Sequence, residues 1–374
     1  MTEFERRLHG LRASMSVQRV DLVAIGPTAN MCYLAGFVPH ADERLCLLLI
    51  STQSVQAVVP KLNAEEWMAR RQQATGSQQA TGGQLPVHTW ADEHGPDAAL
   101  KQTLANLGRV KRLAVDGAMR ADFLLPLLAA TGAPETVSAE ALIGPLRARK
   151  SAPEIDALAR AAAQADRAMQ AAVDACQPGV SESQVAWAAE AAFRMDGAQE
   201  VCFTLVAAGP NGAYPHHHSS QRRLKRGDAI ILDIGASLDG YKSDITRVVF
   251  LGAPPREFRR AYEAVLAANT RGRAAVRPGV TAQQVDHATR SSLEAQGYGE
   301  HFIHRTGHGL GLEVHEAPYI TATNEQPLEI GMVFSVEPGV YLPGQFGVRI
   351  EDVVVVTDAG ERTLTGFDHQ LIVK

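Results

Sequence analysis

Apolar positions along the first 145 residues fall into short runs of strand length that alternate with longer segments of helical periodicity. Such alternation is typical of a small α/β domain in which helices cover a sheet. Strands are predicted at Leu22–Ile25, Leu45–Ile50, Ala57–Val59 and Arg112–Val115, and helices at Phe4–Met15, Asp97–Leu107 and Ala121–Ala130. This domain, residues 1–145, contains no group of residues that indicates catalysis.

A helix-start signal marks the beginning of a second domain, residues 146–374. Ser151 and Glu154 have the spacing of a capping box, and Pro153 lies in the first turn, where its nitrogen needs no hydrogen-bond partner. The Ala-rich segment that follows predicts a long helix to about Cys176.

Two later stretches of this domain repeat one another at a spacing of 100 residues. The motif Pro-Gly-Val-Ser/Thr opens a predicted helix at Ser181 and again at Thr281, and the helices are expected to stop near Gly197 and Gly297. In both copies a glutamine three residues after the Ser or Thr completes the same capping box. Each copy also follows another long helical segment, the second being Arg256–Val276. These matches predict two copies of one helix-helix-strands unit.

Each copy is followed by apolar runs that carry acidic residues. In the first copy, Ala229–Ile234 and Ile245–Phe250 are predicted strands joined by a turn over residues 235–240. Asp233 lies in the first run and Asp244 just before the second, both where apolar residues are expected. A carboxylate in a buried strand is costly unless it is paired or holds a cation. Two carboxylates side by side on one hairpin therefore indicate half of a metal site.

The second copy contains a matching pair of acids. Met332–Glu337 is an apolar run that ends in a carboxylate, residues 338–347 are rich in turn formers, and Val348–Val356 is a second run that contains Glu351. If a pseudo-two-fold axis relates the copies, all four carboxylates converge on a central sheet. Four clustered anions need more than one divalent cation to neutralise them.

Histidines precede the acidic strands in both copies. They are His216, His217 and His218 in the first copy, and His304, His308 and His315 in the second. His308 lies between two glycines, which let the backbone pass close to a ligand or ion. The second group indicates a metal ligand together with groups for proton transfer or oxyanion binding.

Composition narrows the class of partner and compartment. The formal net charge of −5 and the isoelectric point near 6.2 argue against nucleic acid or a membrane surface as a partner. The first twenty residues lack a signal-peptide core, and no apolar run reaches the roughly 18 residues of a membrane span, so we expect a cytoplasmic protein. The four cysteines lie in apolar sequence and predict buried free thiols. The repeated QQATG segment between Gln72 and Gly82 predicts a surface loop.

Four segments resemble the signature blocks of the pita-bread metallopeptidases: LDIGASLDGYKSDITR, HRTGHGLGLEVHE, SVEPG and GVRIEDVVVV. That family includes Xaa-Pro dipeptidase (prolidase), aminopeptidase P, methionine aminopeptidase and the metal-free creatinase. Asn30–Phe37 resembles part of the creatinase-type N-terminal domain, and Leu146–Ile155 resembles its junction with the catalytic domain. The resemblance covers nearly the whole chain and implies a creatinase-like α/β domain followed by a pita-bread domain with duplicated halves.

Carried over position by position, the resemblance implies two divalent ions and five ligands: Asp233, Asp244, His308, Glu337 and Glu351. Asp244 and Glu351 would bridge the ions. An oxygen-rich set with one imidazole suits manganese or cobalt best, with zinc and iron as alternatives. Because creatinase has lost this set, a creatinase-like activity is disfavoured.

The resemblance also implies roles for residues around the ions. Glu337 would shuttle protons, and either His304 or His315 would donate to the developing oxyanion and protonate the leaving nitrogen. Three further residues are expected to contact the substrate: His216, Arg349 and Tyr241. Arg349 would also orient the bridging carboxylates.

An N-terminal domain of about 145 residues is typical of the proline-specific members. We therefore expect hydrolysis of the bond between an N-terminal residue and proline, in a dipeptide or a longer peptide, by a homodimer. Two alternatives stay open: a hydrolase or lyase that acts on a non-peptide small molecule with the same two metals, and a binding module with an inactive site.

Overall fold

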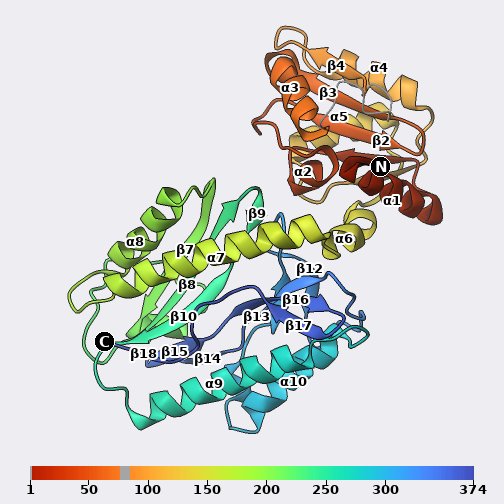
Figure 1. Cartoon of the computed structure of the whole chain (residues 1–374). Helices are drawn as coiled ribbons and strands as arrows, with labels where there is room; N and C mark the ends of the chain where they lie inside the picture. Colours follow the sequence, from red (N-terminus) through yellow and green to blue (C-terminus); the bar gives the residue numbers. More distant parts are fainter. Residues whose placement is uncertain (1, 76–84) are drawn as a thin grey trace. The chain divides into compact units, whose positions relative to one another are not determined.

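The computed structural model describes residues 2–75 and 85–374 and divides the chain into two compact units, Met1–Arg147 and Ala148–Lys374 (Figure 1). Each unit has its own buried apolar clusters. No helix among the described residues has the length and apolar character needed to cross a membrane.

The first unit is a six-stranded sheet with strand order β4-β3-β2-β1-β5-β6. Its strands are β1 (Leu22–Ile25), β2 (Leu47–Ser51), β3 (Val55–Pro60), β4 (Val87–Trp90), β5 (Arg112–Val115) and β6 (Glu135–Ser138). Its helices are α1 (Glu3–Gln18), α2 (Ala29–Ala35), η1 (Lys61–Asn63), α3 (Ala64–Thr75), α4 (Asp97–Leu107), α5 (Ala121–Thr131) and α6 (Glu140–Ala148).

The central strands of this sheet are the ones that the apolar pattern predicts. β1 and β5 match their predictions residue for residue, since both are apolar runs flanked by polar residues. The edge strands β4 and β6 were not predicted, because most of their side chains are half-buried or exposed and leave no apolar run. The predicted loop is wrong for Gln72–Thr75, which continues α3 because Gln and Ala are good helix formers. The rest of the predicted loop, including the second QQATG copy at residues 78–82, lies outside the described residues.

The second unit contains two halves of similar design. The first half holds α7 (Ala152–Ala175), α8 (Glu182–Met195), β7 (Glu200–Ala208), η2 (Gly209–Ala213), β8 (Ala229–Leu238), β9 (Tyr241–Lys242) and β10 (Ile245–Phe250). The second holds α9 (Arg256–Ala275), α10 (Ala282–Glu294), η3 (Gly299–His301), β11 (Gly307–Gly309), β12 (Glu316–Ile320), β13 (Val333–Val336), β14 (Gly339–Leu342), β15 (Phe346–Arg349), β16 (Asp352–Thr357) and β17 (Gly360–Thr363). The last strand, β18 (Ile372–Val373), pairs with β10 of the first half.

The predicted duplication is confirmed by matching hydrogen bonds. Ser181 and Thr281 each accept a bond from the backbone of the glutamine three residues later, and both capping boxes are complete. The glycine before each helix also donates its N–H to a leucine carbonyl, Gly179 to Leu224 and Gly279 to Leu328, at 2.8 Å in both cases. In Figure 1, α7 and α8 lie on one side of the sheets and α9 and α10 on the other.

The acidic hairpins differ in detail from their predictions. β8 continues to Leu238, so the turn after it is shorter than residues 235–240 and is made by Asp239 and Gly240, both with positive φ. Gly235 lies inside β8, and glycine is required there because a Cβ would lie 2.4 Å from the carbonyl oxygen of Ser243. In the second half the expected turn, residues 338–347, contains β14 and part of β15, which form a hairpin of their own.

Candidate metal centre

The two halves meet at the residues that carry the acids. Glu351 lies between β15 and β16 and forms an isolated bridge with Thr246 of β10. The backbone N–H of Glu351 donates to the carbonyl of Thr246 at 3.2 Å, and the Thr246 hydroxyl donates to Oε2 of Glu351 at 2.7 Å. Asp233 is opposite Thr246 in the register of β8 and β10. Strand pairing within and between the halves therefore brings these acids together.

Three of the expected ligands form a tight buried group. One ligand atom from each of Asp244, His308 and Glu351 lies within 4.8 Å of the other two. Nε2 of His308 is 3.6 Å from Oδ2 of Asp244 and 3.2 Å from Oε1 of Glu337, which adds a fourth residue. Asp233 lines the same cavity as these four. The sequence prediction thus named five residues that the structure collects at one place.

Burial and mutual repulsion control the charges of this group. The pKa values of Asp244 and Glu351 are raised well above their ordinary values, chiefly by burial and then by the neighbouring carboxylates. Burial also acts to raise the pKa of Glu337, but a hydrogen bond with His308 and the charge of that residue outweigh it and lower the pKa to about 2. The acids therefore repel one another in a site that protein cations do not fully neutralise.

Two unsatisfied oxygen atoms test whether metal ions fit here. Oδ1 of Asp233 and Oε1 of Glu351 are buried and have no hydrogen-bond partner among the described residues. A buried acceptor without a partner costs free energy, and a cation removes that cost. Carboxylate oxygens with one imidazole are also a donor set that divalent first-row ions accept. The residues present therefore fit divalent metal ions.

A cavity of about 710 Å³ opens beside these carboxylates. Its wall includes apolar side chains from β7 and from the segment before β12, which sequence reasoning did not single out: Phe203, Leu205 and Val314. Arg305 also lines the cavity and was missed. Its guanidinium lies 4.8 Å from the ring centroid of Tyr319, and no carboxylate among the described residues pairs with it. The cavity thus combines acids, an apolar wall and one uncompensated cation.

His304 uses both ring nitrogens in the resting structure. Nδ1 is 2.8 Å from the carbonyl oxygen of Arg305, so Nδ1 carries the proton, and Nε2 is 2.8 Å from the hydroxyl of Tyr341. Burial lowers the pKa of His304. Because Arg349 donates to the oxygen of Tyr341 at 2.8 Å, the Tyr341 hydroxyl has its own proton available for Nε2. No proton of His304 therefore points into the cavity.

His315 is placed differently. It lines the cavity, and its ring packs edge to face on His308 with centroids 4.1 Å apart. Burial, followed by the positive charges of His308 and Arg305, lowers the pKa of His315 to about 4. A neutral His315 keeps one ring N–H that can donate to a substrate oxygen.

The three residues that were expected to contact the substrate, His216, Arg349 and Tyr241, lie in different positions relative to the cavity. His216 lines the cavity. Arg349 also lines it, but its guanidinium is buried and bound to the protein, with Nη2 2.6 Å from Oδ2 of Asp233 and Nε 3.2 Å from the Thr246 hydroxyl. Tyr241 is not among the residues that line this cavity, because its hydroxyl donates to Glu154 on α7 at 3.0 Å. The structure brings the first two to the site and not the third.

Comparisons with known proteins agree with this geometry. The sequence profile of Metallopeptidase family M24 matches residues 156–358, and that of the Creatinase/Prolidase N-terminal domain matches residues 7–149. The Xaa-Pro dipeptidase of Pyrococcus furiosus is 33% identical over 369 residues, which are 98% of this chain and 100% of the relative.

Solved structures extend the likeness to the fold. A prolidase from Thermococcus sibiricus is 34% identical with a TM-score of 0.91, and all of both chains is covered. Dipeptidase PepE from Mycobacterium ulcerans is 38% identical with a TM-score of 0.90 over 99% of this chain and 98% of that one. The predicted creatinase-like and pita-bread architecture is thereby confirmed. The chain belongs to Metallopeptidase family M24, and it is a peptidase that depends on divalent metal ions.

Proposed function

We propose that this protein is a two-metal peptidase that hydrolyses the bond between an N-terminal residue and a following proline, with dipeptides as its substrates. The observation that carries the proposal is the convergence of four carboxylates and one imidazole beside a cavity with an apolar wall. The relatives named as Xaa-Pro dipeptidase and prolidase support the choice of proline, whose ring is apolar and compact.

In this proposal the catalytic domain is residues 146–374, and two divalent ions would be held by five residues: Asp233, Asp244, His308, Glu337 and Glu351. We expect both ions to be manganese or both to be cobalt, because most of the donor atoms are oxygen. When bound, the ions would supply Lewis acidity, which would lower the pKa of the attacking water and polarise the scissile carbonyl.

The side chains around the ions have separate tasks. Glu337, whose Oε1 lies 3.2 Å from Nε2 of His308, accepts the proton of the attacking water and delivers it toward the leaving nitrogen of proline. His315 donates its ring N–H to the carbonyl oxygen as negative charge develops there. Of the two histidines that the sequence left open, His315 is supported because both nitrogens of His304 are already bonded. His304 then acts through Tyr341 and Arg349 to keep Asp233 in place.

The cation at the cavity wall supports a short substrate. Arg305 has no carboxylate partner among the described residues, so it can take the C-terminal carboxylate of a dipeptide through charge-assisted hydrogen bonds. His216 lies on the same cavity and would contact the peptide backbone. We further propose a homodimer, as the family resemblance implies, and a cytoplasmic location, which the four free cysteines support. Burial of all four was predicted, but only Cys46 and Cys176 are buried, and Cys32 and Cys202 are half-buried.

An assay of chain length and class tests the proposal. The protein loaded with manganese is incubated with Ala-Pro, Gly-Pro and an X-Pro-X tripeptide, and release of the first residue is measured. We expect cleavage of both dipeptides, weaker cleavage of the tripeptide, and loss of all activity in Asp244→Ala. Inactivity on all three peptides by a protein that binds two ions would refute the proposal and favour a non-peptide substrate.

A further inference from the structure

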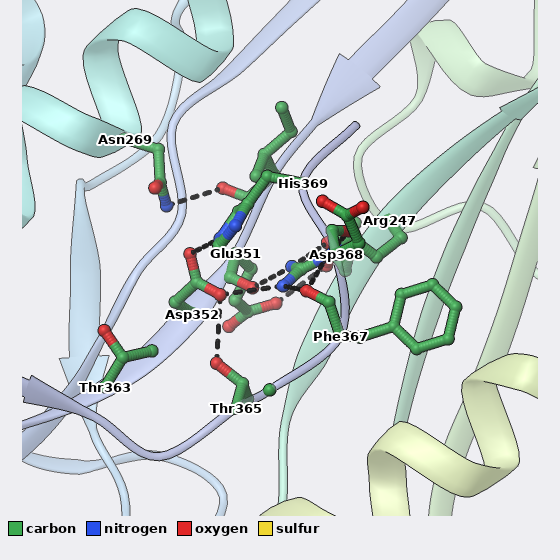
Figure 2. Close-up of polar contacts among 12 residues, drawn as sticks. Arg247, Asn269, Glu351, Asp352, Thr363, Thr365, Phe367, Asp368 and His369 are labelled. Atoms are coloured by element: carbon green, nitrogen blue, oxygen red, sulfur yellow. Dashed lines mark hydrogen bonds and ion pairs between the residues drawn. The ribbon is translucent and has the colours of Figure 1, made fainter. Parts of the chain in front are cut away.

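A buried ion pair lies directly behind the metal-binding carboxylates. Arg247 of β10 and Asp352 of β16 are joined by Nη2 and Oδ1 at 2.8 Å, and their side chains are 1% and 0% exposed (Figure 2). A buried pair of this kind is weak evidence for stability, because desolvation offsets the attraction and apolar residues often replace such pairs without loss. Its position beside Glu351 suggests another role.

Arg247 joins three segments that are far apart in the sequence. Nη1 donates to the carbonyl of Thr246 at 2.9 Å and to the carbonyl of Glu351 at 2.6 Å. Nε and Nη2 donate to the C-terminal segment, at 3.0 Å to the carbonyl of Asp368 and at 2.7 Å to that of Phe367. One guanidinium thus holds a strand of the first half, a ligand-bearing segment of the second half and the segment that leads to β18.

The contact to Glu351 is the informative one. Glu351 lies outside the regular strands, so sheet pairing does not hold its backbone on both sides. The backbone N–H of Glu351 donates to the carbonyl of Thr246, and the carbonyl of Glu351 accepts a hydrogen bond from the guanidinium of Arg247. The backbone of this expected bridging ligand is therefore held by two adjacent residues of the other half.

The hydrogen-bond network continues from Asp352 to Arg273 and Asn269 on α9. Asp352 accepts hydrogen bonds from Thr365 at 2.9 Å and His369 at 2.7 Å, and Arg273 lies 3.6 Å from its Oδ2. Arg273 in turn donates to Oδ1 of Asn269 at 2.9 Å.

Asn269 completes the connection to both glutamates. Its amide nitrogen donates to the carbonyl of Val336 at 2.9 Å and reaches that of Ile350 at 3.4 Å. These two carbonyls immediately precede Glu337 and Glu351 in the sequence. The side chain of Asn269 is fully buried on α9, so this helix, which carries no ligand, contacts the backbone next to two of them.

We propose that Arg247, Asp352 and Asn269 are positioning residues that hold the backbones of Glu337 and Glu351 and thereby set the affinity of the metal centre. The inference rests on the proposed function, in which both glutamates are ligands. Contacts that orient metal ligands typically change metal affinity by about 10- to 100-fold when they are removed.

Metal titration of the folded, metal-free protein tests this inference. Arg247→Lys keeps the charge but loses the planar fork that serves several carbonyls, and Asp352→Asn keeps the shape but loses the charge. Binding of manganese is followed by calorimetry and by the electron paramagnetic resonance signal of the free ion. We expect apparent affinities about 10- to 100-fold weaker than wild type in both variants. At saturating manganese, kcat should fall while KM for Ala-Pro stays near the wild-type value.

Matched controls separate positioning from general destabilisation. Arg167→Lys and Asp196→Asn make the same changes in an exposed ion pair of the same unit, with Nη2 and Oδ2 2.6 Å apart, and should bind manganese as wild type does. Circular dichroism and thermal melting of the metal-free proteins establish that each variant is folded. Where a buried-pair variant does not fold, Thr365→Val and Asn269→Ala remove single hydrogen-bonding groups and should weaken binding at least threefold.

The reference variant Glu351→Ala distinguishes two kinds of failure. If Glu351→Ala binds manganese like wild type, the proposed metal centre is wrong and this inference falls with it. If Glu351→Ala loses an ion while the folded network variants bind within threefold of wild type, the metal centre stands and only the positioning role is refuted.

Discussion

Arg305 offers the sharpest test of substrate length. The substitution Arg305→Met keeps an unbranched side chain against Tyr319 and removes the cation from the cavity wall. A hydrogen bond to a charged group contributes about 1.5–3 kcal/mol, which corresponds to about 10- to 150-fold in kcat/KM. We therefore expect kcat/KM for Ala-Pro to fall by that factor, mostly through KM, since the carboxylate is bound equally in the ground state and the transition state.

The design pairs the substitution with a change in the substrate. Ala-Pro-amide has the same shape as Ala-Pro but no terminal charge, so wild type should cleave it less well by a similar factor. Arg305→Met should treat the two substrates alike. The assay measures proline or prolinamide release at fixed manganese, with manganese binding as the control for an intact site. An equal loss on both substrates in Arg305→Met would refute a contact between Arg305 and the carboxylate.

Other predictions concern the remaining chemistry and the fold. His315→Ala should lower kcat by about 100- to 1,000-fold with little change in KM, as expected for a donor to developing charge, and steady-state kinetics would contradict this if only KM rose. Burial acts to raise the pKa of Asp352, but contacts with His369 and Arg247 outweigh it and hold that pKa below its ordinary value. The ionised carboxylate therefore stabilises the fold above about pH 4, and this stabilisation is lost on acidification. Urea unfolding of the metal-free Asp352→Asn protein should depend less on pH between about 5 and 3 than unfolding of the wild type does. Gly235→Ala should lower the free energy of unfolding by about 1–3 kcal/mol because its Cβ would meet the Ser243 carbonyl, whereas Gly117→Ala, with no neighbour within 4 Å, should change thermal unfolding little.

Much of the site was predictable from local sequence. Asp233 and Glu351 interrupt apolar runs, and Asp244 and Glu337 stand at the ends of such runs. Because apolar runs of this kind are buried, the anomaly is visible without coordinates. The duplication was predictable for a similar reason, since the capping boxes at Ser181 and Thr281 are local motifs that recur at a fixed spacing.

Side-chain direction was not predictable in this way. Tyr241 lies three residues from Asp244, yet its hydroxyl bonds to Glu154 on α7, and a pairing over that sequence distance leaves no local signal. His304 and His315 looked equivalent in the sequence, but only the neighbours supplied by Tyr341 and the Arg305 backbone show which ring has a proton free.

The sequence by itself determined that four carboxylates stand within or next to apolar runs, where a buried charge is costly unless it is paired or holds a cation. Only the tertiary structure decided how these carboxylates are held. Arg247 of one half donates a hydrogen bond to the carbonyl of Glu351 in the other, and the Asn269 amide donates to the carbonyls that precede Glu337 and Glu351. The physical reason is that burial and capping act over a few residues, whereas these hydrogen bonds join positions whose proximity exists only after the two halves have packed.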